Sequence, residues 1–175
     1  GALGDVEYLV IVMWPLTSYS EANGATIIWP RSHGVEALVE EPKELPIVAQ
    51  AEPGDAIVFL GSTLHGAGAN RSGGVRRGII VSYCLGWLKP YENQWLAYPP
   101  EVAKSFPPEL AALAGYAQHR PNLGNFEGQC PSVLFEGYPE EPLAARDALR
   151  PDQEALLSDH VATQRPAGEG GALAA

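Results

Sequence analysis

The stretch that decides the fold is residues 53–88, PGDAIVFLGSTLHGAGANRSGGVRRGIIVSYCLGWL. It contains a turn, an apolar run, a glycine-rich loop and a second, longer apolar run. Proline fixes φ and glycine permits positive φ, so residues 53–55 predict a turn. The runs Ala56–Leu60 and Val75–Leu88 are rich in β-branched residues and predict two strands.

The rest of the chain divides into a strand-rich part and a helical part. Three more apolar segments bounded by turn residues predict strands: Glu7–Leu16, Ala25–Trp29 and Pro46–Gln50. Short strands separated by Gly and Pro indicate an antiparallel sandwich or a jelly roll. Beyond Pro99, short helices are predicted at Pro100–Lys104, Pro108–Tyr116 and Pro151–Val161. We expect the last ten residues to be disordered.

Composition limits the classes of partner. The 175 residues carry a formal net charge of −10, which argues against a nucleic-acid backbone as ligand. The two cysteines, Cys84 and Cys130, form no C-x-x-C pattern, so we expect a cytoplasmic protein without a disulfide framework. The apolar run Leu9–Trp14 is too short to span a bilayer, and we expect no membrane partner.

Two side chains of chemical interest flank the glycine-rich loop. His65 can hold a metal through a neutral imidazole, and Arg76, eleven residues later, can hold a carboxylate. One interpretation is a metal site that also binds an organic acid; the other is a surface histidine and two solvated arginines. Arg76 and Arg77 must point to opposite faces of a strand, and the residues that follow do not decide which one points inward.

Several motifs carry a resemblance to a known family. In chain order they are Trp14–Thr17, Asn23–Thr26, Pro30–His33, Gly54-Asp55, His65–Asn70, Arg76 and Gly86–Pro90. Over roughly residues 6–98 they resemble the phytanoyl-CoA dioxygenase family, in particular its bacterial and fungal members that act on secondary metabolites. The resemblance implies a mainly β fold, a double-stranded β-helix (jelly roll, cupin-like) with short C-terminal helices. It implies an oxygenase domain over residues 1–138 and a helical or disordered tail over 139–175.

The resemblance also implies a site. Members of this family depend on Fe(II) and 2-oxoglutarate and use O2 to oxidise a small organic, here hydrophobic, substrate. His65 matches the distal metal ligand, Arg76 matches the arginine that binds oxoglutarate, and Trp14 matches a position that can pack against oxoglutarate. No residue is assigned as a catalytic acid or base.

One departure from the family pattern concerns the other two metal ligands. They come from a His-x-Asp motif, but Asp5 is preceded by Leu3 rather than by a histidine, and His33 with Ser32 is expected to have a structural role in a turn. We therefore expect the first strands to lie upstream of Gly1 and this chain alone to be inactive. Two alternatives stay open: a non-catalytic jelly-roll binding module, and a halogenase-type member of the same family.

Overall fold

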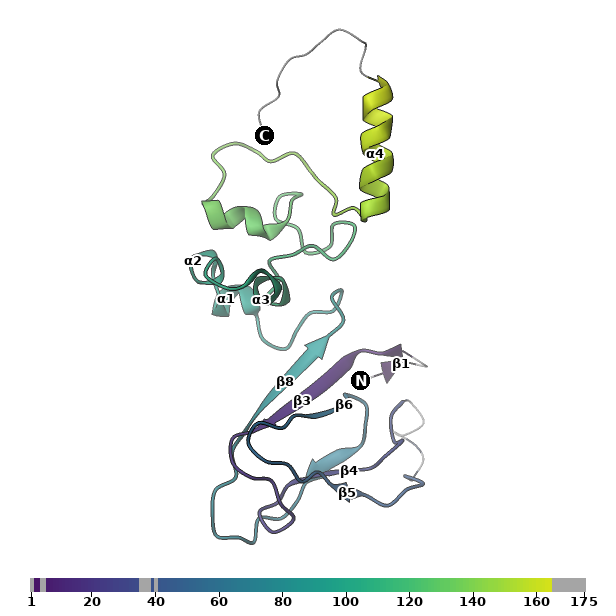
Figure 1. Cartoon of the computed structure of the whole chain (residues 1–175), viewed down its shortest axis with the longest axis vertical. Helices are drawn as coiled ribbons and strands as arrows, with labels where there is room; N and C mark the ends of the chain where they lie inside the picture. Colours follow the sequence, from purple (N-terminus) through teal and green to yellow (C-terminus); the bar gives the residue numbers. More distant parts are fainter. Residues whose placement is uncertain (1, 4–5, 35–38, 40, 165–175) are drawn as a thin grey trace. The chain divides into compact units, whose positions relative to one another are not determined.

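The structure is a computed structural model that describes residues 2–3, 6–34, 39 and 41–164 (Figure 1). Spatial contacts divide the chain into two compact units, residues 1–90 and residues 91–175. This grouping does not test the predicted division into residues 1–138 and 139–175, which stays a prediction.

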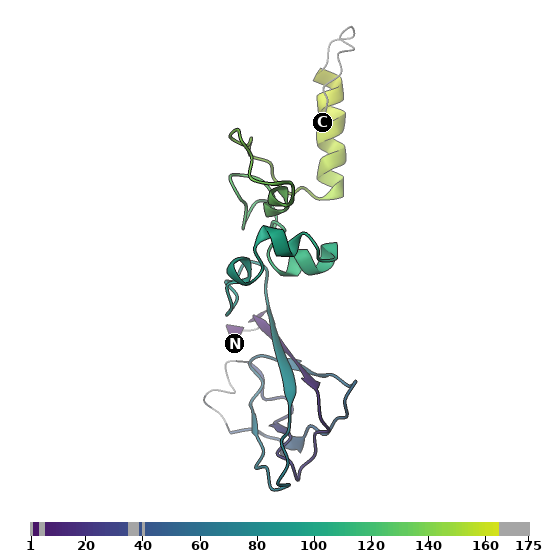
Figure 2. The same ribbon diagram turned by 90° about the vertical axis from the view of Figure 1, so that its left-hand side faces the viewer.

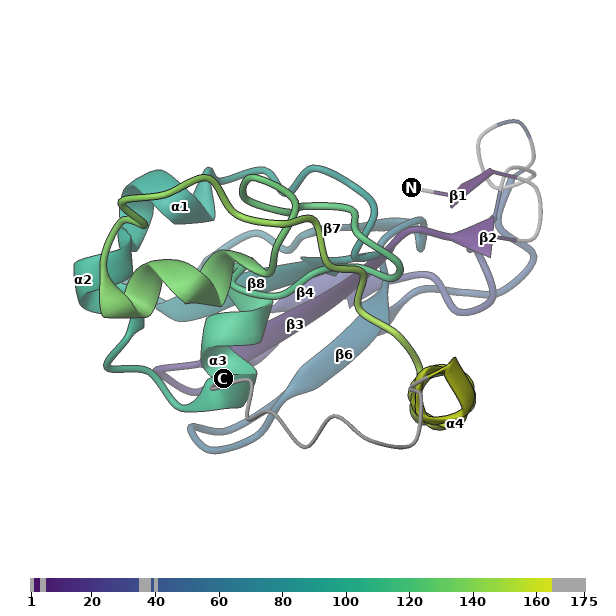
Figure 3. The same ribbon diagram turned by 90° about the horizontal axis from the view of Figure 1, so that it is seen from above.

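The first unit is built from β-strands. They are β1 (Ala2–Leu3), β2 (Val6–Glu7), β3 (Leu9–Pro15), β4 (Thr26–Ile28), β5 (Ile47–Val48), β6 (Ile57–Leu60), β7 (His65–Ala67) and β8 (Gly78–Cys84). β1 and β2 form a hairpin, and the others form two three-stranded antiparallel sheets, β6–β3–β8 and β5–β4–β7. The order β6–β3–β8 can be followed in Figure 3.

All the predicted strands are present, but each is shorter than predicted. The largest change is in Val75–Leu88, of which only Gly78–Cys84 is a strand. The reason lies at Arg77, whose carbonyl accepts hydrogen bonds from the backbone N–H groups of Leu16 and Thr17 at 3.0 and 3.2 Å. This segment therefore bonds to the loop after β3 before the regular ladder begins. β7 was not predicted, because its three residues look like part of a glycine-rich loop.

One face of the β6–β3–β8 sheet forms the main core of this unit, and we call it the inner face. The register places Ile11 opposite Phe59, and Met13 opposite both Ile57 and Ile80. Met13, Tyr19 and Ala25 are buried, with Ile11, Val48, Ala51, Ile57 and Phe59 packed against them, and we call these eight residues the inner cluster. Because Val48 belongs to β5 and Ala25 leads into β4, the inner face packs on the second sheet. Burial of these apolar side chains is what holds the two sheets together.

The opposite, outer face of the same sheet is also apolar. Its side chains alternate with those of the inner face along each strand. Five of them are 36–60% exposed: Val10, Trp14, Val58, Ile79 and Tyr83. An apolar surface of this kind marks a place where further structure or a partner can pack.

The second unit contains short helices and loops. They are α1 (Gln94–Ala97), α2 (Pro100–Ala103), α3 (Pro108–Leu113), the 3₁₀ helix η2 (Pro131–Glu136) and α4 (Pro151–Gln164). Its core consists of small residues and three aromatic rings: Ala103, Ala111, Ala114, Tyr116, Phe106 and Phe135. α4 has no buried residue and stands clear of the other helices of its unit in Figures 1 and 2.

The helices of the second unit agree in part with those predicted from the sequence. The three predicted helices are present with shifted ends, whereas α1 and η2 were not predicted. A mainly β architecture followed by short helices is therefore confirmed. The predicted disorder of the last ten residues lies outside the described residues. No helix in the described part of the chain is long and apolar enough to cross a membrane.

Candidate functional site

His65 opens β7, where it lies opposite Ile28 of β4. Its Nδ1 is 2.8 Å from the carbonyl oxygen of Thr63. A carbonyl can only accept, so in a neutral imidazole this contact assigns the proton to Nδ1 and leaves a lone pair on Nε2. Metal-binding histidines commonly donate their other ring N–H to a carbonyl in this way. The exposed imidazole of His65 therefore fits the role of a metal ligand.

The loop before His65 is fixed by the turn that follows β4. The Ser32 hydroxyl donates to the Trp29 carbonyl at 2.6 Å and accepts from the Leu64 N–H at 2.8 Å. The Trp29 N–H donates to the Leu64 carbonyl at 3.0 Å. Ser32 is buried whereas His33 is exposed. Ser32 thus has the structural role expected of this turn, and the His33 side chain faces solvent.

A carboxylate holds the other end of the same loop. Glu7 accepts hydrogen bonds from the backbone N–H groups of Tyr8 (3.0 Å), Leu9 (3.2 Å) and Ser62 (3.3 Å), and from the Ser62 hydroxyl. Partial burial raises the pKa of the Glu7 carboxyl, but the hydrogen bonds from Ser62 and Leu9 outweigh it and hold that pKa below its usual 4.5. Glu7 therefore favours its charged form and fixes the connection between β6 and β7, which belong to different sheets.

Arg76 and Arg77 have different environments. The Cζ atom of Arg76 is 4.4 Å from the centroid of the Tyr19 ring, which belongs to the inner cluster. Arg76 is half-buried, and within the described ranges no hydrogen bond or ion pair engages its guanidinium. Arg77 has an exposed side chain, and its backbone N–H donates to the Thr17 hydroxyl at 2.9 Å. Of the two arginines, Arg76 is the one that reaches the inner cluster.

The glycine-rich stretch between His65 and Arg76 is joined to the loop after β3. The Gly68 N–H donates to the Ala25 carbonyl at 3.2 Å, and the Arg71 N–H donates to the Ala22 carbonyl at 2.8 Å. A Cβ atom at Gly24 would lie 2.6 Å from the Gly68 carbonyl oxygen, and one at Gly68 would lie 2.8 Å from that of Ala25. Only glycine permits these backbones to pass so closely.

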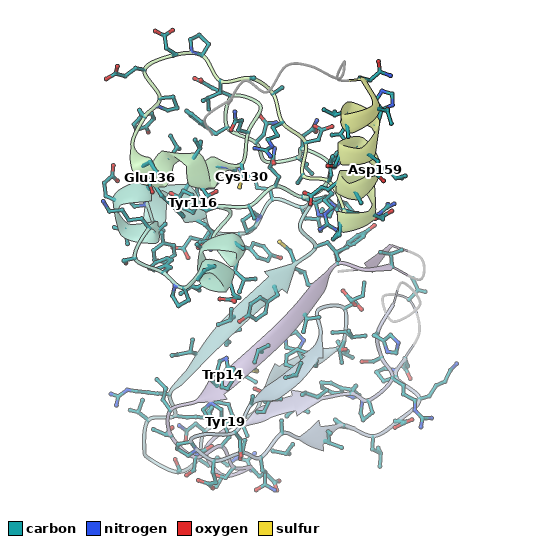
Figure 4. The ribbon with its side chains drawn as sticks, turned by 45° about the horizontal axis from the view of Figure 1, so that its top comes forward. Trp14, Tyr19, Tyr116, Cys130, Glu136 and Asp159 are labelled. Carbon is teal, nitrogen blue, oxygen red and sulfur yellow. The ribbon has the colours of Figure 1, made fainter. Side chains whose placement is uncertain are left out.

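Trp14 lies on the outer face of the sheet. It pairs with Ile79 of β8 and is 42% exposed, whereas its neighbour Met13 points into the inner cluster. Figure 4 labels Trp14 on β3 and Tyr19 in the loop beyond the end of that strand. Trp14 and Arg76 therefore approach different faces of the sheet. The role predicted for Trp14 beside oxoglutarate stays a prediction.

His65 and Arg76 are linked through the inner cluster. The His65 ring lies 4.9 Å from the Phe59 ring between centroids, and Arg76 lies over Tyr19. Phe59 and Tyr19 both belong to that cluster. Sequence reasoning missed Tyr19, although a single aromatic residue between two serines, in a polar turn, was a usable signal.

The described residues do not form a complete metal centre. Among them, no group of three or more His, Cys, Asp or Glu side chains is placed to hold an ion. The role of His65 as a metal ligand therefore stays a prediction.

Comparison with known proteins gives the family. Residues 5–78 match the family described as phytanoyl-CoA dioxygenase (PhyH). This segment belongs to the phytanoyl-CoA dioxygenase family. The matched segment contains Trp14, His65 and Arg76, so the predicted family is confirmed over the part of the chain that carries the candidate site.

The chain is also similar to fungal proteins named dioxygenases. It is 38% identical over 117 residues to dioxygenase cdmD of Talaromyces verruculosus, covering 65% of this chain and 38% of that protein. It is 35% identical over 102 residues to dioxygenase trt7 of Aspergillus terreus, covering 58% and 35%. It is 30% identical over 121 residues to dioxygenase FUM3 of Gibberella moniliformis, covering 69% and 39%. The chain thus spans little more than a third of the length of these relatives.

Proposed function

We propose that this chain is part of an Fe(II)- and 2-oxoglutarate-dependent oxygenase that oxidises a small hydrophobic organic substrate. Membership of the phytanoyl-CoA dioxygenase family and the relatives named dioxygenases support an oxygenase. One observation carries the finer proposal. The imidazole of His65 with Nε2 available and the guanidinium of Arg76 both contact the same inner cluster.

We further propose that the two sheets are part of a double-stranded β-helix. β3 pairs with β8 and β6 in one sheet, while β4 pairs with β7 and β5 in the other. This nested pairing is what results when a long antiparallel hairpin winds into two facing sheets. Since the chain covers about 38% of relatives such as cdmD, further strands and the remaining metal ligands would come from outside the described residues.

In this proposal His65 would hold Fe(II) through Nε2, and Arg76 would bind the distal carboxylate of oxoglutarate. When bound, Fe(II) would supply the activation of O2, and oxoglutarate would supply the two electrons that this activation needs. The Thr63 carbonyl keeps the proton on Nδ1 of His65 and sets the direction of the ring. The guanidinium of Arg76 offers a planar set of N–H donors that can grip a carboxylate with two hydrogen bonds.

Two histidines of unit 1 provide a matched test in the full-length protein. We expect His65→Gln to lose tight Fe(II) binding in an anaerobic calorimetric titration and to form no succinate from oxoglutarate. His33→Gln should behave as the wild type, because His33 is an exposed turn residue. Equal losses in both variants would contradict the assignment of His65.

The same assay separates the alternatives. A wild-type protein loaded with Fe(II) that neither binds oxoglutarate nor forms succinate would favour a non-catalytic binding module. Formation of succinate together with halide incorporation into the substrate would instead favour a halogenase-type member of the family.

A further inference from the structure

We infer that Tyr19 is a positioning residue for oxoglutarate, which holds the guanidinium of Arg76 ready for the distal carboxylate. This inference rests on the proposed function. Tyr19 touches neither a metal nor a reacting atom in this scheme, and it acts only through Arg76.

Tyr19 is fixed more firmly than most residues of its loop. Its side chain is 3% exposed within the inner cluster. Its backbone N–H donates to the Ala51 carbonyl at 2.7 Å, and its carbonyl accepts from the Ala51 N–H at 3.2 Å. The ring therefore has a defined position before any ligand binds.

The Tyr19 ring lies close both to Arg76 and to the start of β8. The guanidinium carbon of Arg76 lies 4.4 Å from the ring centroid, within the range of a cation–π interaction. A Cβ atom at Gly78 would lie 1.9 Å from the Tyr19 hydroxyl oxygen. Glycine at the first position of β8 thus leaves the space that the ring needs beside Arg76.

This contact restrains Arg76 without using its hydrogen-bond donors. An aromatic face attracts the cation through its quadrupole, so the guanidinium N–H groups stay available for a carboxylate. A free arginine side chain loses rotamer entropy when it binds a ligand, and restraining it beforehand reduces that loss. Arg77 lacks a ring contact of this kind among the described residues and is exposed.

The test uses Tyr19→Leu and Tyr19→Phe in the full-length protein. We expect Tyr19→Leu to weaken oxoglutarate binding in an anaerobic calorimetric titration about fivefold to thirtyfold. That range corresponds to a contact of about 1–2 kcal/mol at 1.4 kcal/mol per tenfold. The KM for oxoglutarate should rise by the same factor with kcat unchanged at saturation. Tyr19→Phe should match the wild type, because it keeps the ring face.

A second pair of variants separates positioning from a general structural role. In an Arg76→Gln background, Tyr19→Leu should cause no further loss of oxoglutarate binding. If leucine impairs folding, judged by thermal melting, Tyr19→Met fills the same space without a ring and replaces it in the test.

The outcomes distinguish this inference from the proposed function. If the wild type fails to bind oxoglutarate, the proposed function itself fails. If the wild type binds it and Arg76→Gln weakens binding, but Tyr19→Leu and Tyr19→Phe bind equally well, the proposed function stands and Tyr19 has no positioning role. An equal loss from Tyr19→Leu with and without Arg76 would also overturn the inference.

Discussion

The inner and outer faces of the β6–β3–β8 sheet are both apolar, yet His65 and Arg76 both contact the cluster on the inner face. Met13 and Trp14 are neighbours on β3, and they are 7% and 42% exposed. The inner face packs on the second sheet and is reached by His65 through Phe59 and by Arg76 through Tyr19. On the side of the outer face, Arg77 is exposed and has no ring contact among the described residues. The apolar pattern of a strand therefore does not show which of its faces lies beside a candidate site. Here the polar side chains that contact the inner cluster indicate the face.

The largest expected effect concerns the two adjacent arginines. Arg76→Ala in the full-length enzyme should raise the oxoglutarate concentration for half-maximal succinate formation about thirtyfold or more. Truncating one partner of a buried charge pair costs about 2–5 kcal/mol. Arg77→Ala should change it less than about fivefold, because an exposed charge contributes under about 1 kcal/mol. Equal effects would show that both faces serve the carboxylate.

The next effect concerns core packing on the two faces. Met13→Ala should lower the free energy of unfolding by about 2–5 kcal/mol, because it opens a cavity in the inner cluster. It also removes the sulfur that lies 3.5 Å from the Thr26 hydroxyl on the facing sheet. Trp14→Ala should lower the free energy of unfolding by a smaller amount. Chemical denaturation of both variants measures the difference. A greater loss at Trp14 would mean that the outer face is covered in the intact protein.

A smaller loss is expected from crowding the inner face. Gly78→Ala should lower stability by about 1–3 kcal/mol, since its Cβ would displace the Tyr19 ring. Gly74→Ala is the control, because there the nearest side-chain atom to a new Cβ, the Ser72 hydroxyl, is 3.7 Å away. Thermal melting compares the two, and an unchanged melting temperature in Gly78→Ala would show that the ring can move without cost.

The smallest effect concerns the connection that keeps the two sheets facing each other. The pKa of Glu7 is lowered in the folded protein, so the charged carboxylate stabilises the fold. This contribution to the free energy of unfolding is fully present above the usual pKa of 4.5 and is lost as pH falls through the folded-state pKa. Glu7→Gln should therefore lower the free energy of unfolding by less than about 1 kcal/mol at pH 7. Its difference from the wild type should shrink below about pH 4.5. Urea unfolding across this pH range measures it, and a constant difference would contradict a charge effect.

Sequence patterns could predict strands wherever an apolar run is long. β3, β6 and β8 were found this way because each contains three consecutive residues of strong β preference. β7 could not be found, since its three residues His65–Ala67 pair with β4 only through the tertiary fold. The helices α1 and η2 lack a periodic apolar pattern long enough to detect.

The site was predictable in its residue types but not in its arrangement. His65 and Arg76 stand out by their chemistry and spacing. The face of Arg76 could not be read from the strand itself, because the residues on both faces of β8 are largely apolar. It depends on Tyr19, a residue of another loop, whose contact is a matter of three-dimensional packing.

The close crossing of Gly24 and Gly68 has a consequence for any survey of random substitutions in this protein. At both positions a new side chain would strike backbone atoms, which cannot rotate away as a side chain can. Neither position should therefore be rescued by a second change nearby. In an activity screen, substitutions at both glycines would abolish activity as fully as substitutions at His65, although neither glycine is assigned a role in binding a ligand. The effect of each substitution on activity therefore has to be compared with its effect on the amount of folded protein. Only a position that loses activity without losing folded protein can be assigned a role in catalysis or ligand binding.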